Sequence, residues 1–231
     1  MNPIQQECTR RGITRLCHFT QSRNIAHIFD EPFGLYSTKT LRDNDMPYNP
    51  TDPERYDGRD ELICCSVEYP NTYYFDRVKS KEPLFKDWVI LYIDPMYLWH
   101  PDTFFCPCNA ARRCGTYIQG ETSGFQALFL QSSPGINFNR NPRHLPAAPT
   151  DIQAEVLIND PIPLDSIIGV VVQNNDQAKN EMLRLSLQGI TLNKPIYIIP
   201  EFYNKALISR LIQSGNRVTE TLYNHGDRHG R

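Results

Sequence analysis

Three motifs that define large enzyme classes are missing from this chain of 231 residues. There is no Gly-x-Gly-x-x-Gly, no Walker-type phosphate loop and no Gly-x-Ser-x-Gly. The first motif places a dinucleotide on a Rossmann unit, the second cradles the phosphates of a nucleoside triphosphate, and the third exposes the nucleophile of an α/β-hydrolase. Their absence argues against a Rossmann dehydrogenase, a nucleotide triphosphatase and an α/β-hydrolase.

Strong charge and long apolar runs are also lacking. The net charge of -2 and the pI near 6.3 argue against a protein that coats a nucleic-acid duplex. They leave open an enzyme that holds a few nucleotides in one local basic groove. The longest apolar stretches, such as residues 167–172, are far too short to cross a bilayer. Because no charged start followed by an apolar run opens the chain, we expect no signal peptide and no membrane partner.

Disulfide chemistry is not indicated either, although the chain has seven cysteines. Seven is an odd number, and without a signal peptide the simplest location is the reducing cytoplasm, with free thiols. The motif Cys106-Pro107-Cys108, together with Cys114, suggests a metal site. Its first spacing is one residue, however, whereas knuckle-type zinc sites usually show two to four. We therefore expect no metal, and a zinc-holding binding module remains an alternative.

The composition is that of a globular chain able to build a core, with 40% hydrophobic and 22% charged residues. Proline-rich polar segments predict long loops at residues 42–60 and 131–150, and loops of this length are often functional. Residues 102–124 are expected to be irregular. Runs rich in β-formers predict strands at 13–19, 62–67, 88–93, 153–158, 167–172 and 196–199. Apolar spacing and end signals predict helices at 21–29, 176–187 and 204–214.

These elements predict a single α+β domain, with a split, mostly antiparallel β-sheet and short flanking helices. We expect the domain to cover residues 13–218. Residues 1–12 would be an N-terminal extension, and residues 219–231 would be a polar, frayed C-terminal tail.

Glu155 is the most unusual residue of the predicted strands. It lies in the run Gln153-Ala154-Glu155-Val156-Leu157-Ile158, where alternate side chains face opposite sides of a strand. Glutamate is disfavoured in strands, and a carboxylate within an apolar strand needs a reason. Either this is an edge strand with Glu155 in water, or the carboxylate belongs to a site.

Two other segments are candidates for ligand binding. His18, in Cys17-His18-Phe19-Thr20, either bonds a ligand hydroxyl or is a half-buried histidine bonded to backbone. Thr20 is equally well explained as the N-cap of the following helix. Arg55, in Arg55-Tyr56-Asp57-Gly58, is either a fork-shaped ligand for a pyrophosphate or a surface arginine in a turn.

Taken together, these segments resemble the DarT-type family of DNA ADP-ribosyltransferases. The resemblance rests on an ordered set of segments between about residue 13 and residue 172, and its specificity comes from the order. The set contains Cys17-His18-Phe19-Thr20 with Asn24, Gly34-Leu35, Arg55-Tyr56-Asp57-Gly58, the run from Ile63 to Asn71, Trp88-Val89-Ile90-Leu91 through Asp94-Pro95, and Gln153 to Ile158.

The resemblance implies an ADP-ribosyltransferase-like split sheet, with NAD bound as co-substrate in the cleft between its halves. Glu155 would be the catalytic glutamate, in a Gln-x-Glu pattern found across ADP-ribosyltransferases. Arg55 would meet the NAD phosphates or steady the reacting centre, with Arg59 as the other candidate. The cofactor-binding residues implied by the resemblance are His18, Thr20, Asn24, Leu35, Arg55 and Gln153.

The chemistry explains why a carboxylate is needed. Cleavage of the nicotinamide bond leaves positive charge on the ribose, as in glycoside cleavage. A carboxylate beside the ribose can bond its 2'-hydroxyl, stabilise that charge and accept a proton from the attacking atom. No metal is required for any of these steps.

The resemblance also implies a substrate and a partner. Residues 131–152 would form the substrate-recognition loop, and single-stranded nucleic acid is expected because pairing hides the base edge in a duplex. Phe138, Arg140, Arg143 and His144 would stack on and steer the strand, unless the loop is an ordinary surface excursion. Such enzymes commonly act as toxins in toxin–antitoxin or phage-defence systems, so a cognate antitoxin is the expected protein partner.

Three alternatives remain at this point. The sequence Arg55-Tyr56-Asp57-Gly58 stands where other family members have a glycine-rich stretch, which leaves RNA in place of DNA as a possible target. Many toxins with Gln-x-Glu modify protein side chains instead. The third alternative is the zinc-holding binding module, which is not an enzyme.

Overall fold

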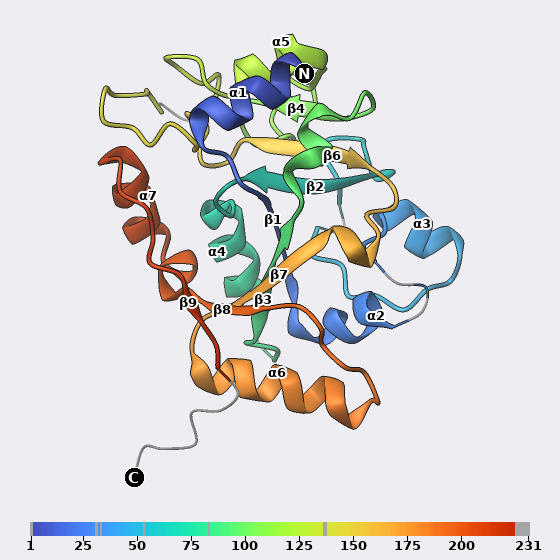
Figure 1. The fold of residues 1–231 in the computed structure, drawn as a ribbon. Helices are drawn as coiled ribbons and strands as arrows, with labels where there is room; N and C mark the ends of the chain where they lie inside the picture. Colours follow the sequence, from blue (N-terminus) through green and yellow to red (C-terminus); the bar gives the residue numbers. More distant parts are fainter. Residues whose placement is uncertain are drawn as a thin grey trace.

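The computed structural model describes residues 2–30, 32, 34–52, 54–82, 84–135 and 138–224. Within these residues, nine strands form one sheet in the order β5-β4-β6-β2-β1-β3-β7-β8-β9 (Figure 1). All neighbouring strands are antiparallel except β7 and β8. The strands are β1 (Leu16–Gln21), β2 (Leu62–Val67), β3 (Trp88–Ile93), β4 (Phe104–Cys106), β5 (Gln119–Gly120), β6 (Glu155–Asn159), β7 (Ile167–Val172), β8 (Ile196–Ile198) and β9 (Thr221–Leu222).

The helices are short, and most of them begin at a side-chain cap. The side chains of Asn2, Ser37, Asn71, Asn174 and Asn204 each accept a backbone N–H in the first turn of the helix that follows. The α-helices are α1 (Pro3–Arg11), α2 (Ile25–Phe29), α3 (Thr38–Asp43), α4 (Thr72–Lys81), α5 (Glu121–Ala127), α6 (Asn175–Leu187) and α7 (Lys205–Gln213). Single 3-10 turns are η1 (Ser22–Asn24), η2 (Pro95–Trp99), η3 (Leu164–Ser166) and η4 (Pro200–Tyr203).

Both faces of the central strands are buried. On β3, Val89, Leu91 and Ile93 pack into a layer closed by α1, α2, α5 and α6. Ile90 and Tyr92 point the other way, into a layer closed by α4 and α7. Figure 1 shows α4 and α7 together on one side of the sheet. Burial on two faces explains why this strand reads as a continuous apolar run rather than an alternating one.

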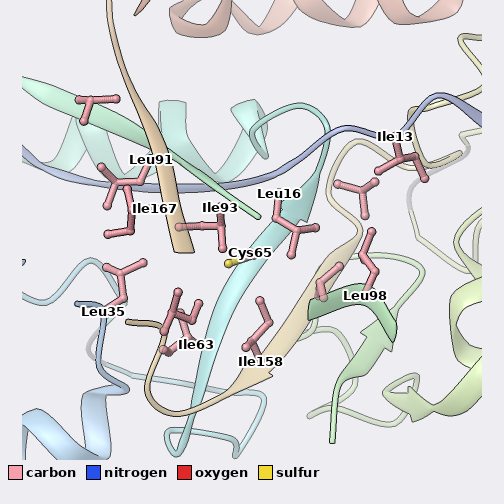
Figure 2. Packing of buried hydrophobic residues seen from close by; sticks show 14 of the residues in the cluster. Ile13, Leu16, Leu35, Ile63, Cys65, Leu91, Ile93, Leu98, Ile158 and Ile167 are labelled. Carbon is pink, nitrogen blue, oxygen red and sulfur yellow. The ribbon is translucent and has the colours of Figure 1, made fainter. Parts of the chain in front are cut away.

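The first core layer continues across strands that are far apart in the sequence. In Figure 2, Leu16 of β1, Cys65 of β2 and Ile93 of β3 meet, and Ile63 and Ile158 extend the layer toward β6. These five side chains are each at most 3% exposed. The layer therefore holds the two halves of the sheet on one continuous core.

The sheet splits between β1 and β2. These two strands pair only at Leu16 with Val67 and at Cys17 with Ser66. Beyond that point β1 stays paired with β3 as far as Gln21, whereas β2 turns to β6. The backbone bonds between the two halves are therefore few and lie at one end of the strands.

A buried carboxylate braces this closed end of the split. Glu68 directly follows β2 and is fully buried. Its side chain accepts from the backbone N–H of Thr14 at 2.7 Å and from Arg217 Nη1 at 2.9 Å. Arg15 Nη2 lies 3.7 Å from the same carboxylate and 2.6 Å from Glu220. The C-terminal segment is thus joined to the junction of β1 and β2.

The structure confirms the predicted fold class and most of the predicted elements. Strands 62–67, 88–93 and 167–172 have the predicted bounds, and the bounds of the two later helices differ from the prediction by at most one residue. The strand predicted to start at 153 begins at Glu155, because the Asp151 carboxylate accepts the backbone N–H of Gln153 at 2.9 Å and forms a turn. The described part of residues 131–150 has no helix or named strand, as expected.

Other segments differ from what the sequence led us to expect. The expected irregular segment 102–124 contains β4, β5 and the start of α5, and helices α3 and α4 were not predicted. The expected extension 1–12 contains α1, whose Ile4 and Cys8 enter the core. The expected frayed tail contains β9, which pairs with β8, while residues 225–231 lie outside the described part. The division into an extension, a domain and a tail stays a prediction.

Candidate active site

The split in the sheet opens into a cavity of about 370 Å³, a size suited to a small molecule or cofactor. Consecutive residues of both strands line it, from Cys17 to Thr20 on β1 and from Leu62 to Ser66 on β2. Consecutive side chains of a strand point to opposite faces. Residues from both faces of β1 and β2 can line one cavity here because the two strands diverge and leave their facing edges free.

His18 spans the open part of the split. Its Nδ1 lies 2.9 Å from the carbonyl oxygen of Cys64 on β2, and because a carbonyl only accepts, Nδ1–H is the donor. Burial lowers the pKa of His18, so the ring is neutral and its Nε2 is an acceptor. A half-buried neutral histidine in a cavity wall can accept a hydrogen bond from an amide or a hydroxyl of a ligand. The bond of His18 to backbone is therefore confirmed, and its contact to a ligand stays a prediction.

Glu155 is the first residue of β6 and lies on the wall of the same cavity. It is 9% exposed, so it is not the solvated side chain of an edge strand. Asn109 Nδ2 donates to its Oε1 at 2.8 Å. Burial raises the pKa of the carboxyl to about 8. A carboxyl group with this pKa can both release and accept a proton near neutral pH, which is the requirement for proton transfer in catalysis.

The segment between α3 and β2 forms another wall of the cavity, and Asn24 ties it to the end of β1. The Asn24 amide exchanges hydrogen bonds with both the backbone and the side chain of Asn49, each at 2.9 Å. It also donates to Thr20 Oγ1 at 2.9 Å. Thr20 therefore supports Asn24, and it does not cap the following helix, whose cap residue Gln21 makes no side-chain cap bond. Thr20, Asn24 and Asn49 all line the cavity.

Leu35 reaches the cavity through a close approach of two backbones. Its N–H donates to the Ile162 carbonyl at 2.8 Å, and Ile162 N–H donates back at 2.9 Å. Gly34 precedes it with φ of +125°, and an added Cβ would lie 2.4 Å from the Ile162 oxygen. Only glycine fits there, and this explains why a glycine precedes Leu35 in the sequence.

Arg55 also lines the cavity, but most of its donors are already used. Nε and Nη2 donate to the two carboxylate oxygens of Asp57 at 3.0 and 2.9 Å, and Nη1 donates to the Leu62 carbonyl at 2.9 Å. Nη2 also donates to the Arg59 carbonyl. The Arg59 side chain is on the surface, 3.4 Å from Glu61, and does not line the cavity. Of the two candidate arginines, Arg55 is the one at the site.

Gln153 is not on the wall of this cavity. It lines a second hollow, together with Tyr73, Arg77, Arg112 and the buried Asp151. Burial raises the pKa of Asp151 to about 6. The two hollows are adjacent, since Tyr74, Asn109 and Ala111 line both.

The four residues predicted for substrate binding differ in how far the structure exposes their side chains. Arg143 is exposed, and Phe138 packs edge-on against Tyr73 with ring centres 5.7 Å apart. His144 is buried, with Nε2 3.0 Å from the Pro149 carbonyl, and burial lowers its pKa to about 4. Arg140 is turned inward as well. These two side chains hold the loop together and are not available to a strand of nucleic acid.

Replacing Arg140 by alanine should destabilise the fold. Its guanidinium donates to the carbonyls of Ala148, Leu145 and Pro146 at 2.9, 3.0 and 3.3 Å. Burial, with Arg11 nearby, lowers its pKa to about 10. We expect Arg140→Ala to lower the free energy of unfolding by about 2–4 kcal/mol in urea titration. The exposed Arg143→Ala is the matched control and should change it by less than about 0.5 kcal/mol. Equal effects of the two changes would contradict this assignment.

The cysteines of the motif are not grouped with a third possible metal ligand among the described residues. Within the part of the chain that the structure describes, no three side chains of His, Cys, Asp or Glu are grouped as metal ligands. Cys106 and Cys108 are buried with sulfur atoms 4.0 Å apart, and Cys114 is exposed. No described helix is both long enough and apolar enough to cross a bilayer.

The split sheet is the fold of solved DarT proteins. The chain is similar to DarT of Thermus sp. 2.9 in complex with NAD+ (TM-score 0.56, 11% identity, 82% of this chain and 97% of that chain covered). It is equally similar to DarTG of Thermosipho africanus in complex with ADP-ribose (TM-score 0.56, 15% identity), where 82% of this chain covers 51% of the other. The chain thus spans about half the length of the Thermosipho protein. No curated protein matches the sequence significantly.

The family model described as ssDNA thymidine ADP-ribosyltransferase, DarT, matches residues 17–204. Because this range is most of the chain, the chain belongs to the DarT family. The resemblance seen in the sequence is confirmed, and so is the expected fold.

Two residues of the site were not predicted from the sequence. Asn109 bonds the carboxylate of Glu155, and Asn49 bonds Asn24. The only signal for Asn49 was its place in a long proline-rich loop. Asn109 directly follows the cysteine motif, and nothing in its local sequence indicates a contact with Glu155.

Proposed function

We propose that this chain transfers ADP-ribose from NAD to a base in single-stranded DNA, with Glu155 as the catalytic residue. The observation that carries the proposal is the buried Glu155 carboxyl on the wall of the cavity that His18 spans, in a chain of the DarT family. The cavity is large and enclosed enough to hold part of a dinucleotide away from water.

Each residue of the cavity has a proposed part in this reaction. Glu155 bonds the ribose 2'-hydroxyl, stabilises the positive charge that develops as nicotinamide leaves, and accepts the proton of the attacking base nitrogen. His18 accepts from the nicotinamide amide or a ribose hydroxyl through Nε2. Thr20, Asn24 and Leu35 shape the pocket around the nucleotide. These proposals are supported by the position of all five residues on the cavity wall.

Arg55 contributes to NAD binding in a limited way. A guanidinium has five N–H donors, and four hydrogen bonds to Asp57, Leu62 and Arg59 use most of them. We propose that the remaining donor and the positive charge meet the NAD phosphates. For Gln153 we propose a contact to the acceptor base rather than to NAD, because it lines the adjoining hollow.

DNA is favoured over RNA and over protein as the substrate. The family is described by its action on single-stranded DNA, and a relative of similar fold was solved with ADP-ribosylated single-stranded DNA (DarT of Thermus sp. 2.9; TM-score 0.54, 11% identity, 83% and 97% covered). Arg77, Arg112 and Arg143 are exposed arginines on the side of the second hollow and the loop. We propose that they contact phosphates, with Phe138 beside the strand.

The test is incubation of the purified chain with NAD labelled in the adenylate part and with separate pools of single-stranded DNA, duplex DNA, RNA and protein. The proposal expects label on single-stranded DNA above all other pools. Label confined to RNA or to protein would support one of the other targets instead. Bound zinc on the purified chain, without transfer to any pool, would support the binding module.

Replacing His18 by alanine should weaken NAD binding. The change removes the Nε2 acceptor, and we expect the Kd for NAD to rise about tenfold, the effect of about 1.4 kcal/mol. Calorimetric titration with NAD measures it. His100→Ala, at an exposed histidine away from the cavity, is the control and should bind NAD as the unchanged chain does. If His18→Ala also binds NAD normally, His18 has no part in the site.

The biological setting is proposed on the same family membership. One relative of this fold is described as DarTG, and we propose that this chain is the toxin of a toxin–antitoxin or phage-defence pair in the cytoplasm. A cognate antitoxin would be its protein partner. Co-expression with genes adjacent to its own would test this, with relief of growth arrest as the expected result.

A further inference from the structure

Asn109 lies where the chain leaves β4 and passes Glu155. Cys106, the last residue of β4, is paired with Glu155 in the sheet. Three residues later Asn109 is half-buried and lines both hollows. Its Nδ2 donates to Glu155 Oε1 at 2.8 Å, a short bond of the kind formed with a charged acceptor.

The orientation of the Asn109 amide is determined by a second bond. Its Oδ1 accepts the backbone N–H of Ala111 at 3.2 Å, in an Asx turn. Because the oxygen is occupied there, the NH₂ group must be the side that faces Glu155. The backbone of Ala110 also hydrogen-bonds the Glu155 carboxyl. The loop 109–111 thus presents donors to this one carboxylate.

Donors matter at this position because the surroundings oppose a charged carboxylate. Burial is the largest effect and raises the pKa of Glu155 to about 8, and the Ala110 bond acts in the opposite direction. The negative charges of Asp57 and Asp52 also raise the pKa of Glu155, and the positive charge of Arg55 lowers it. The ionisable groups that face Glu155 are Asp52, Arg55 and Asp57 from the loop before β2, Cys64 from β2, Tyr74 from α4 and Cys106 from β4.

We propose that Asn109 is a positioning residue for Glu155: its NH₂ group stabilises the ionised form of this carboxyl relative to the protonated form and fixes the plane of the carboxyl at the cavity wall. This inference rests on the proposed function for its meaning in catalysis. Its effect on Glu155 itself can be measured without NAD and without DNA.

Two variants separate this role from a purely structural one. Asn109→Asp keeps the oxygen that accepts the Ala111 N–H, so the turn is preserved, but it places a second carboxyl against Glu155. Asn109→Ala removes both bonds. If Asn109 only shaped the turn, Asn109→Asp would resemble the unchanged chain and Asn109→Ala would be the more affected variant. A positioning residue predicts the opposite order.

The matched control is Asn174→Asp. Asn174 is exposed, lines neither hollow, and its side chain accepts the Gln177 N–H at 2.9 Å at the start of α6. The change adds the same charge and keeps the same type of bond. It should leave the pKa of Glu155 and the transfer rate as they are.

The experiment is a pH titration of the Glu155 side-chain carbon by NMR in the unliganded chain, with the signal assigned by its loss in Glu155→Gln. We expect the pKa of Glu155 to rise by about one pH unit in Asn109→Ala and by more in Asn109→Asp, a tenfold or larger increase in proton affinity. The rising limb of kcat against pH should move by the same amount, while the KM for NAD changes less than about threefold.

A shift of less than about 0.3 pH units in both variants, which is about twofold in proton affinity, would overturn the proposal. So would a larger shift in Asn109→Ala than in Asn109→Asp. If the unchanged chain shows no transfer activity, the proposed function is contradicted, but the NMR titration still decides the role of Asn109. Near-ultraviolet circular dichroism of each variant confirms that it is folded before titration.

Discussion

Replacing Glu155 by glutamine will lower the rate of ADP-ribose transfer by on the order of 10²–10⁴-fold and leave the chain folded. Glutamine has the shape of the carboxyl and can still accept from Asn109 Nδ2. It carries no charge to stabilise the ribose cation and cannot take up the proton of the attacking base. Single-turnover transfer from labelled NAD to single-stranded DNA measures the effect. Glu121→Gln, at an exposed glutamate, is the control and should transfer normally.

The same variant should gain stability at alkaline pH. The pKa of Glu155 is raised from 4.5 to about 8, so between these values the folded chain keeps a proton that the unfolded chain has lost. Stability therefore decreases as the pH rises through this window, and glutamine escapes the loss. Near pH 9 we expect Glu155→Gln to unfold in urea with a free energy higher by on the order of 2 kcal/mol. A less stable variant that is also inactive would show only that the site had collapsed.

Annealing the DNA to its complement will lower modification on the order of a hundredfold. The attacked base edge is paired inside a duplex, and extruding the base costs a few kcal/mol before it can approach the ribose. The comparison uses one oligonucleotide, alone and annealed, at the same concentration and salt. An annealed strand with a single mismatch at the modified base is the control and should recover most of the labelling. Equal labelling of single strand and full duplex would refute a single-strand requirement.

The strands could be predicted because their composition decides them. Residues 88–93 and 167–172 are rich in β-branched and aromatic residues and, apart from the exposed Ile168, are buried, so no other element competes. Helix α4 was missed for the same reason: its first turn, Thr72-Tyr73-Tyr74-Phe75, has the composition of a strand. Its helical form is started locally by the Asn71 cap and depends on the packing of Phe75 and Val78 against α7, which is a tertiary contact.

The site could be predicted only in part. A carboxylate in an apolar strand is a visible anomaly, so Glu155 could be found. The direction of a long side chain is not visible, because Arg140 and Arg143 look alike in a loop sequence although one is bonded inward and the other is exposed. Asn109 could not be found, because its importance comes from the pairing of Cys106 with Glu155, two residues that are 49 positions apart in the chain.

The brace around Glu68 brings segments from both ends of the polypeptide to the junction between the two halves of the sheet. At this junction β1 and β2 are paired at two positions. One side chain of the brace, Arg217, also donates to the Gly12 carbonyl at 2.8 Å and is supplied by the segment after α7. Arg217 and Glu220 line neither hollow, so the C-terminal segment is anchored at the closed end of the split without forming any of the cavity wall.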